Sequence, residues 1–268
     1  MTASPEQVAR FRQLHESGCF VMPNPWDAGS ARALAEMGFQ ALATTSSGFA
    51  WSTGHADNTV GLDLTLKHLR LIAAAVDVPV NADFQSGYAT RPEDVAANVA
   101  LAVETGVAGL SIEDFSGDPA EPLFEFGLAV ERVRAARAAI DETGSGVVLT
   151  ARSEGFVWDR PDLDETIRRL QAYSEAGADC LYAPGITSLE HVASIVAAVA
   201  PKPVNLLIHT PFTTVAEAAQ LGVRRISVGG ALAKTAWHGF LDAAREIAED
   251  GTFSRFAGLP DLNGLLGS

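Results

Sequence analysis

The amino-acid sequence predicts a (β/α)8 TIM barrel, in which eight parallel strands alternate with helices. Three observations support this fold. Short β-branched runs alternate with longer amphipathic runs, and the strand-like runs are apolar throughout, as in a parallel sheet covered on both faces. Glycine repeatedly stands where a helix must end before the next strand, as in Met37-Gly38-Phe39 and Leu221-Gly222-Val223. Eight such units in about 250 residues favour a closed barrel over an open sheet.

In the first half of the chain, each predicted strand is a short apolar run and each predicted helix a longer amphipathic one. A polar segment with a helical pattern, 1–16, comes first. The elements that follow are strand 19–22, helix 28–37, strand 41–45, helix 63–76, strand 79–83, helix 92–105, strand 109–113 and helix 128–142. Asp63 and Asp94 stand in the first turns of their helices, where a carboxylate is favourable, and Gly106 ends the helix before the fourth strand.

The second half of the chain repeats the pattern. Its elements are strand 147–152, helix 163–176, strand 180–183, helix 189–200, strand 204–208, helix 214–221, strand 225–228 and a helical stretch after residue 233. Asp164 lies in the first turn of its helix, and Gly177 ends that helix. With this stretch, the count reaches eight strand–helix units.

A single domain over residues 1–268 is expected, because 47% of the residues are hydrophobic and no low-complexity linker divides the chain. Residues 233–268 are expected to form a C-terminal helical extension that includes Trp237 and Phe240. The residues alone leave open whether this apolar helix packs on its own barrel or is exchanged between subunits.

Composition excludes several classes of protein. The formal net charge of −14, with no basic patch, disfavours nucleic acid and anionic membrane surfaces as partners. The two cysteines, Cys19 and Cys180, lie in apolar stretches and suggest neither a disulfide framework nor a zinc cluster. No apolar run approaches the roughly 20 residues that cross a bilayer, and no secretion signal precedes the first strand, so a cytoplasmic location is expected.

Three polar signals follow successive buried strands, and they indicate a functional site. They are Asn81-Ala82-Asp83, Ser111-Ile112-Glu113-Asp114 and Ala151-Arg152-Ser153-Glu154. Because the carboxyl ends of barrel strands meet at one rim, these side chains should converge there. A carboxylate at the end of a buried strand is costly without a cation or donors, so a hard divalent cation and an anionic substrate are expected. Arg152 would neutralise the carboxylates, bind a substrate carboxylate, or do both.

Weaker candidates lie in neighbouring loops. The segment 44–50 reads as a small-residue turn whose Ser46, Ser47 and Gly48 could approach a carboxylate or enolate oxygen, although such a segment is more often a plain tight turn. Asp57 is a candidate partner of water bound to a metal. His209 ends the seventh strand and could line the rim, although it has no second histidine or cysteine at ligand spacing.

Five segments in order resemble the isocitrate lyase and phosphoenolpyruvate mutase superfamily. They are 23–32 (PNPWDAGSAR), 45–48 (TSSG), 81–88 (NADFQSGY), 111–114 (SIED) and 151–153 (ARS). The resemblance extends from about residue 11 to residue 240. It implies a (β/α)8 barrel in tetramers, often with the last helix exchanged between paired subunits. It also implies Mg2+ or Mn2+ chelated by a 2-oxo carboxylate, and cleavage or formation of C–C or P–C bonds through an enolpyruvate-like intermediate.

The resemblance also implies roles for individual residues. Asp83 and Glu113 would hold the metal, largely through water, with Asp57 in support. Arg152 and the Ser46-Ser47-Gly48 turn would bind the carboxylate and oxo groups of the substrate. The metal and the turn would together stabilise negative charge that develops on the ketone oxygen.

Two departures from the superfamily pattern narrow the reaction. Asn81 stands where metal-binding members carry the first acid of Asp-Ala-Asp; its amide oxygen can still ligate Mg2+ but adds no charge. The loop 115–124 lacks the Lys-Lys-Cys-Gly-His of the lyase branch and the Lys and Asn-Ser of the mutase branch. This argues against isocitrate cleavage and phosphonomutase activity. The prediction is a metal-dependent lyase of a small 2-oxo acid, with oxaloacetate decarboxylation favoured. The alternatives are a noncatalytic 2-oxo acid-binding protein and a phosphonopyruvate-type mutase or hydrolase.

Overall fold

The computed structural model describes residues 2–118 and 120–266, which fold into a barrel of eight parallel strands. The strands are β1 (Phe20–Met22), β2 (Leu42–Ala43), β3 (Val80–Asp83), β4 (Gly109–Glu113), β5 (Val148–Arg152), β6 (Cys180–Tyr182), β7 (Val204–Leu207) and β8 (Arg225–Ser227). Their order in the sheet is β1-β8-β7-β6-β5-β4-β3-β2. The remaining edges, β1 and β2, approach each other, and the Ala43 N–H donates to the Pro23 carbonyl at 3.1 Å. The predicted (β/α)8 barrel is confirmed.

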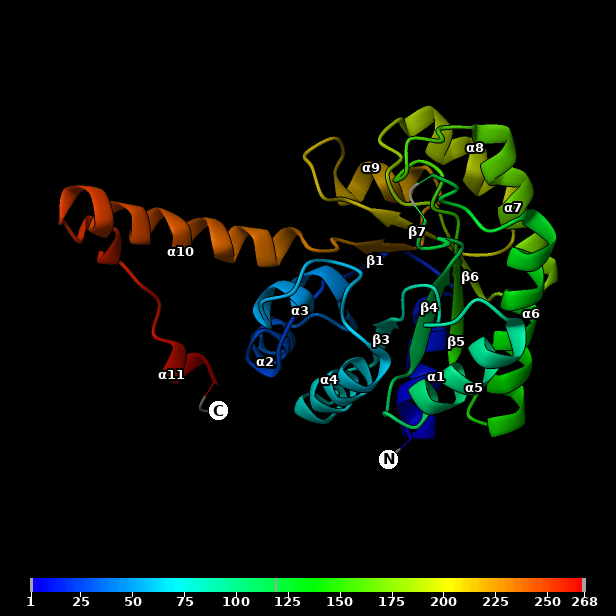
Figure 1. The fold of residues 1–268 in the computed structure, drawn as a ribbon, viewed down its shortest axis with the longest axis horizontal. Helices are drawn as coiled ribbons and strands as arrows, with labels where there is room; N and C mark the ends of the chain where they lie inside the picture. The colour runs from blue at the N-terminus through cyan, green and yellow to red at the C-terminus, as the bar shows by residue number, and fades with distance from the viewer. Residues whose placement is uncertain (1, 119, 267–268) are drawn as a thin grey trace.

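Helices surround the barrel on its outer side (Figure 1). They are α1 (Pro5–Leu14), α2 (Ala28–Glu36), α3 (Ser46–Ser52), α4 (Leu62–Ala75), α5 (Pro92–Val103), α6 (Phe126–Thr143), α7 (Leu163–Glu175), α8 (Leu189–Val199), α9 (Val215–Gln220) and α10 (Ala231–Asp250), followed by a 3-10 turn at Ser254–Phe256 and α11 (Leu262–Leu266). Each of the predicted strands, and each predicted helix from 28–37 to 214–221, is present with ends that differ by no more than two residues. The N-terminal helix is shorter than the predicted segment 1–16. None of the helices in the described part of the chain is long and apolar enough to span a membrane.

The segment 44–50 is the main local difference from the sequence-based expectation. It is not an open turn, because α3 begins at Ser46 and Thr45 caps it by accepting a hydrogen bond from the Gly48 N–H at 3.3 Å. Phe49 and Ala50 of this helix are buried in a small apolar cluster with Val60. Burial of these two side chains favours a helical turn with an apolar inner face over an exposed loop.

The amino end of the barrel is closed by α1. Phe11 is fully buried and lies against β4, where a side chain at Gly109 would meet the Phe11 ring at 2.5 Å. A Ser4 capping box fixes the start of α1, and His15, which caps its end, packs edge-on against Phe11 and Phe20. The interior of the barrel is therefore accessible from the carboxyl end of the strands, where the polar residues identified in the sequence lie.

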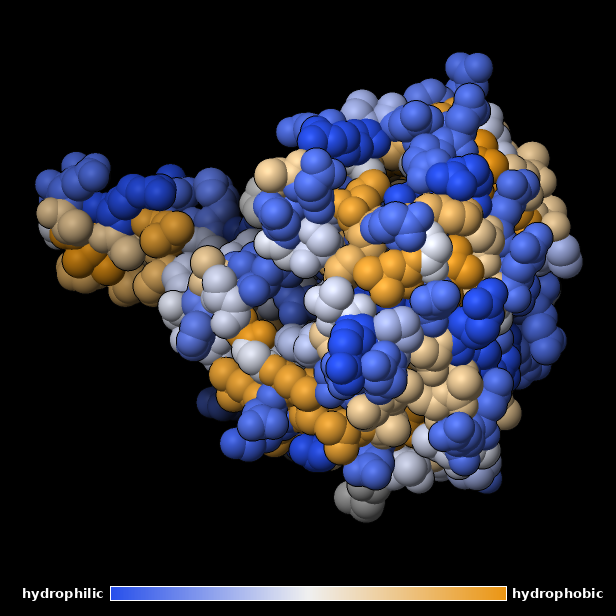
Figure 2. All heavy atoms as spheres, turned by 45° about the vertical axis from the view of Figure 1, so that its right-hand side comes forward, coloured by the Kyte–Doolittle hydropathy of each residue, from blue (hydrophilic) through white to orange (hydrophobic). Residues whose placement is uncertain are grey.

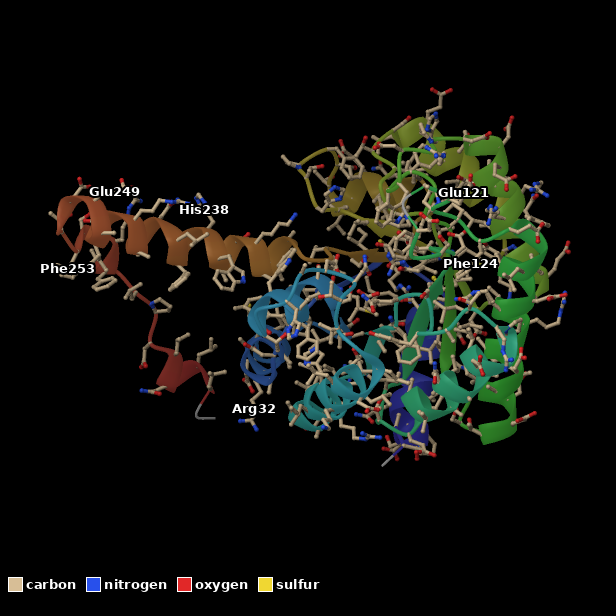
Figure 3. The ribbon with its side chains drawn as sticks, in the orientation of Figure 1. Arg32, Glu121, Phe124, His238, Glu249 and Phe253 are labelled. Atoms are coloured by element: carbon tan, nitrogen blue, oxygen red, sulfur yellow. The ribbon has the colours of Figure 1, made fainter. Side chains whose placement is uncertain are left out.

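The last long helix, α10, leaves the barrel and projects away from it (Figure 1). Its exposed apolar side chains include Trp237, Phe240 and Leu241. Figure 2 shows apolar residues gathered along one side of the projecting arm and charged residues along the other. Figure 3 shows His238 and Glu249 on the polar side of α10, which faces away from α2 and α4.

Candidate active site

A cavity of about 490 Å3 opens at the carboxyl ends of the strands. Seven of the nine residues selected from the sequence line it: Ser46, Ser47, Asp57, Asn81, Asp83, Glu113 and Arg152. Gly48 and His209 do not. Gly48 is buried beside the cavity, and a side chain there would meet the Thr45 methyl at 2.6 Å, so glycine is required for packing. His209 is exposed because β7 ends at Leu207 and the chain then turns outward; Asn205 and Leu207 line the cavity in its place.

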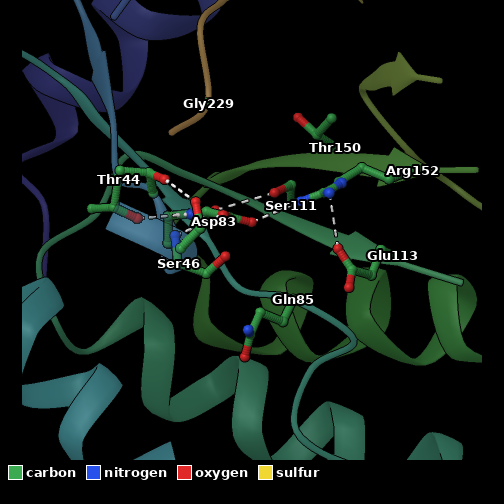
Figure 4. A network of polar contacts seen from close by, with 12 residues as sticks. Thr44, Ser46, Asp83, Gln85, Ser111, Glu113, Thr150, Arg152 and Gly229 are labelled. Carbon is green, nitrogen blue, oxygen red and sulfur yellow. Dashed lines mark hydrogen bonds and ion pairs between the residues drawn. The ribbon is translucent and has the colours of Figure 1, made fainter. Parts of the chain in front are cut away.

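Arg152 lies at the centre of the acidic side of the cavity (Figure 4). One terminal nitrogen lies 2.7 Å from Asp83 Oδ1, the other lies 3.0 Å from Glu113 Oε2, and Nε lies 2.8 Å from Glu154 Oε1. The strand register produces this arrangement, because Glu113 of β4 pairs with Arg152 of β5. Both roles predicted for Arg152 remain compatible with this geometry, and charge neutralisation is directly visible in it.

Asp83 is held by the start of α3. Its Oδ2 atom accepts a hydrogen bond from the Ser46 N–H at 2.9 Å, and its own N–H donates to Thr44 Oγ1 at 2.9 Å. The Ser46 N–H, expected to face a substrate oxygen, is therefore already used by Asp83. The Ser47 hydroxyl lies 3.1 Å from Thr45 Oγ1 and lines the cavity. Of this segment, the Ser47 side chain is the group best placed to meet a ligand.

The carboxyl groups of the site repel one another. Burial raises the pKa of Glu113 well above its ordinary value, although Arg152 acts to lower it. Burial also raises the pKa of Glu154 against the opposing effect of Arg152. The pKa of Asp57 is raised by burial and then by the negative charge of Asp83. With four carboxyl groups around one guanidinium, this side of the cavity is an environment that attracts a cation.

The residues present fit a hydrated divalent cation. The donors that line the cavity here are oxygens, which Mg2+ and Mn2+ prefer, and Asn81 Oδ1 is buried without a hydrogen-bond partner in the described structure. Within residues 2–118 and 120–266, no three acidic, histidine or cysteine side chains converge closely enough to chelate a metal directly, and Arg152 lies among the acids. A cation bound largely through water is compatible with both facts, because its ligands need not approach one another as closely.

Several residues of the cavity were not identified from the sequence. Asn205 and Arg225 line it, and both are buried; Glu154, which belongs to the motif 151–154 but was given no role of its own, is buried and lines it too. Asn24 also lines it; its Oδ1 accepts hydrogen bonds from the N–H groups of Val228 and Gly229, and its Nδ2 donates to the Thr44 carbonyl. A polar residue inside an apolar strand run is the signal that could have identified Asn205, whereas Arg225 follows Arg224 at the start of β8 and has no such signal.

The segment after β4 lies beside the cavity. Phe115 stacks on Trp158, with ring centroids 4.0 Å apart, and Trp158 lines the cavity. Asp114 anchors the start of this segment, because it accepts hydrogen bonds from the Glu154 N–H at 2.8 Å and the Tyr173 hydroxyl at 2.7 Å. Residue 119, within the loop 115–124, lies outside the described residues. The loop sequence has no cysteine, lysine or histidine for proton transfer.

Comparison with known proteins gives consistent matches over almost the whole chain. The family model described as "Phosphoenolpyruvate phosphomutase" matches residues 11–248. A solved structure of a candidate lyase/mutase from Burkholderia cenocepacia J2315 has a TM-score of 0.95 and 44% identity, with 98% of this chain and 97% of that chain covered. An uncharacterized protein of Mycobacterium tuberculosis (strain ATCC 25618 / H37Rv) is 34% identical over 245 residues, 89% of each chain. An oxaloacetate decarboxylase of Paraburkholderia xenovorans (strain LB400) is 28% identical over 236 residues, 84% of this chain and 76% of that protein.

Proposed function

Because the chain belongs to the phosphoenolpyruvate phosphomutase family, whose relatives include carbon–carbon lyases, we propose that it is a divalent-metal-dependent lyase of a small 2-oxo carboxylic acid. The observation that supports this proposal most is the Asp83–Arg152–Glu113 arrangement in the cavity. It combines a site that attracts a cation with a guanidinium that can pair with a carboxylate. Both are needed to bind a 2-oxo acid together with a metal ion.

Asp83 and Glu113 would hold Mg2+ or Mn2+ largely through water, with Asn81 and Asp57 close by, and the cation would supply a Lewis acid for charge that develops on the ketone oxygen. Arg152 would bind the substrate carboxylate, and its ion pairs with three acids fix its orientation. The Ser47 hydroxyl would donate to the same end of the substrate. The stacked Phe115 and Trp158 rings would limit access of water from the side of the loop after β4.

Decarboxylation of oxaloacetate requires the fewest catalytic groups in addition to these residues and the cation. It breaks the C–C bond between the departing carboxylate and the carbon next to the ketone, which leaves an enolate that water can protonate, so no cysteine is needed in the loop 115–124. Similarity to a bacterial oxaloacetate decarboxylase over 84% of the chain supports this choice.

We expect oxaloacetate turnover that requires Mg2+ or Mn2+. Asp83→Asn and Glu113→Gln should each lower kcat/KM by about 100-fold or more, since they remove charge from the cation site. Asp94→Asn, an exposed acid at the start of α5, is the control and should leave kcat/KM unchanged. Steady-state assays of pyruvate release with each variant test this. If no 2-oxo acid is turned over with either metal, while 2-oxo acids still bind, the noncatalytic binding protein takes the place of the lyase.

A second copy of the chain would be the protein partner. The apolar side of α10 is exposed, and a shallow groove lies at its start between Trp26, Ser52 and Phe240. Exchange of α10 between subunits, in a dimer or tetramer, would cover these side chains.

A further inference from the structure

Arg225 is a buried cation in the interior of the barrel, and its guanidinium reaches Thr150 of β5. It is the first residue of β8, which lies four strands away from β4 in the barrel order. Its side chain is 1% exposed and lines the same cavity as Asp83 and Arg152. Nε donates to Asn205 Oδ1 at 2.8 Å and one terminal nitrogen to Thr150 Oγ1 at 3.0 Å. The other terminal nitrogen lies 3.2 Å from His15 Nε2.

The three partners of Arg225 are uncharged. Thr150 and Asn205 carry no charge, and His15 stays neutral because burial and the charge of Arg225 lower its pKa to about 3. His15 Nδ1 lies 2.7 Å from the Phe11 carbonyl and must donate to it, which leaves Nε2 as the acceptor for Arg225. No carboxylate in the described ranges forms an ion pair with Arg225, whereas buried Arg152 pairs with three acids and Arg169 with two.

A buried guanidinium without a counter-charge is energetically costly, unless an anion pairs with it. Arg132 shows the structural alternative: it is equally buried and also lacks an acid within the described residues, but it donates to the carbonyls of Ser86, Ala89 and Thr90 and does not line the cavity. The hydrogen bonds of Arg132 thus stabilise the loop 86–90, whereas Arg225 lines a cavity that a ligand can enter.

We propose that Arg225 binds a second carboxylate of the substrate, which makes the substrate a 2-oxo dicarboxylate; this rests on the proposed function and names its substrate class. A guanidinium has five N–H groups, and three are used by Asn205, His15 and Thr150. One N–H on each terminal nitrogen remains, which matches the two oxygens of one carboxylate. The 2-oxo acid end would lie near Asp83 and Arg152, and the far carboxylate near Arg225.

The position of Arg225 also bears on the reaction. In oxaloacetate, the second carboxylate is the one that departs as CO2, and pairing it with a guanidinium stabilises the ground state of that step. Five- and six-carbon 2-oxo dicarboxylates carry their second carboxylate farther from the ketone, so Arg225 can hold it without contacting a carboxylate that departs. Binding of these longer diacids therefore tests the contact with Arg225 separately from decarboxylation.

The test is calorimetric titration of the full chain with matched ligands in saturating Mg2+. The pairs are 2-oxoglutarate with 2-oxopentanoate and 2-oxoadipate with 2-oxohexanoate, which differ only in a terminal carboxylate or methyl group. A charged hydrogen bond contributes roughly 10- to 100-fold in affinity, so at least one diacid should bind tighter than its partner by that factor. Arg225→Met should reduce the preference to about threefold or less and leave monoacid affinity unchanged within that factor. Arg224→Met, the same change one residue earlier outside the cavity, is the matched control and should keep the preference.

Thermal melting followed by circular dichroism checks that each variant is folded. If Arg225→Met does not fold, Arg225→Gln, which can still donate to Asn205 or Thr150, replaces it. Mg2+-dependent binding of 2-oxopentanoate without preference for either diacid in the unmodified protein overturns this inference alone. A preference that survives in the Arg225 variant overturns it too. Failure of all four acids to bind overturns both this inference and the proposed function.

Discussion

At the scale of single residues, Asn81 limits the charge of the proposed cation site. Its side chain is 3% exposed, and its Oδ1 has no hydrogen-bond partner among the described residues. Asn81→Asp should raise Mg2+ affinity by about 10-fold, because a carboxylate adds charge to the ligand set. The same change should destabilise the metal-free protein, since another buried negative charge joins Asp83 and Glu113.

Calorimetry with Mg2+ and thermal melting with and without metal measure both effects. Asn98→Asp is the control, because Asn98 donates to the Gly87 carbonyl and lies outside the cavity. Unchanged Mg2+ affinity in Asn81→Asp would show that residue 81 does not contribute to the cation site.

His15 couples the stability of the fold to pH. Burial and then Arg225 lower its pKa from 6.5 to about 3. The neutral form is therefore the one the fold requires, so its contribution is complete above pH 6.5 and is lost as the pH falls toward 3. Between pH 7 and 4.5, His15 alone should cost about 2–3 kcal/mol of unfolding free energy.

His15→Gln removes the titration and keeps an oxygen acceptor for Arg225. In urea titrations at pH 7 and 4.5, this variant should lose about 2–3 kcal/mol less stability than the unmodified protein. Equal losses in the two proteins would mean that His15 is not held neutral in the fold.

At the scale of elements, the projecting α10 is the helix through which we propose that subunits associate. Phe240 is 60% exposed and lies beside Trp237 on the apolar side of α10, with ring centroids 5.4 Å apart. Phe240→Glu should weaken self-association by roughly 10- to 100-fold, because it replaces apolar contact with a buried charge. Sedimentation velocity over a range of concentrations measures the effect. His238→Glu adds an acid to the polar side of the same helix and should not change the sedimentation coefficient (Figure 3). Sedimentation of the unmodified protein as a monomer at all concentrations would contradict the proposed role of α10.

The elements were predictable because their signals are local. Continuous apolar runs, glycines after helices and acids in first turns predicted each strand and the helices between the strands within two residues. The helix α3 was missed because its seven residues, SSGFAWS, have a glycine and three serines, and burial of Phe49 and Ala50 is a tertiary effect.

At the scale of the whole molecule, the two sides of the cavity differ in charge. Carboxylates from β3 to β5 and the following loops surround Arg152, whereas Arg225 of β8 contacts the amide of Asn205 from β7 and pairs with no acid in the described chain. The sequence indicated the acidic side, since its motifs end strands. It did not indicate the basic side, because only the closed barrel and its register determine that Arg225 points inward.

The join between β1 and β2 has a different consequence. These two strands are not paired as a ladder in the described structure; the Ala43–Pro23 hydrogen bond and the Asn24 side chain link them instead. Asn24 also holds the turn after β8. The link between β1 and β2 therefore depends largely on the side-chain amide of Asn24, and local opening of the barrel should begin there. Backbone amide protons of β1 and β2 should exchange with solvent sooner than those of β4 and β5. Asn24 and Thr44 also line the cavity. A ligand that contacts them would stabilise the link between β1 and β2, so ligand binding should slow hydrogen exchange at these two strands.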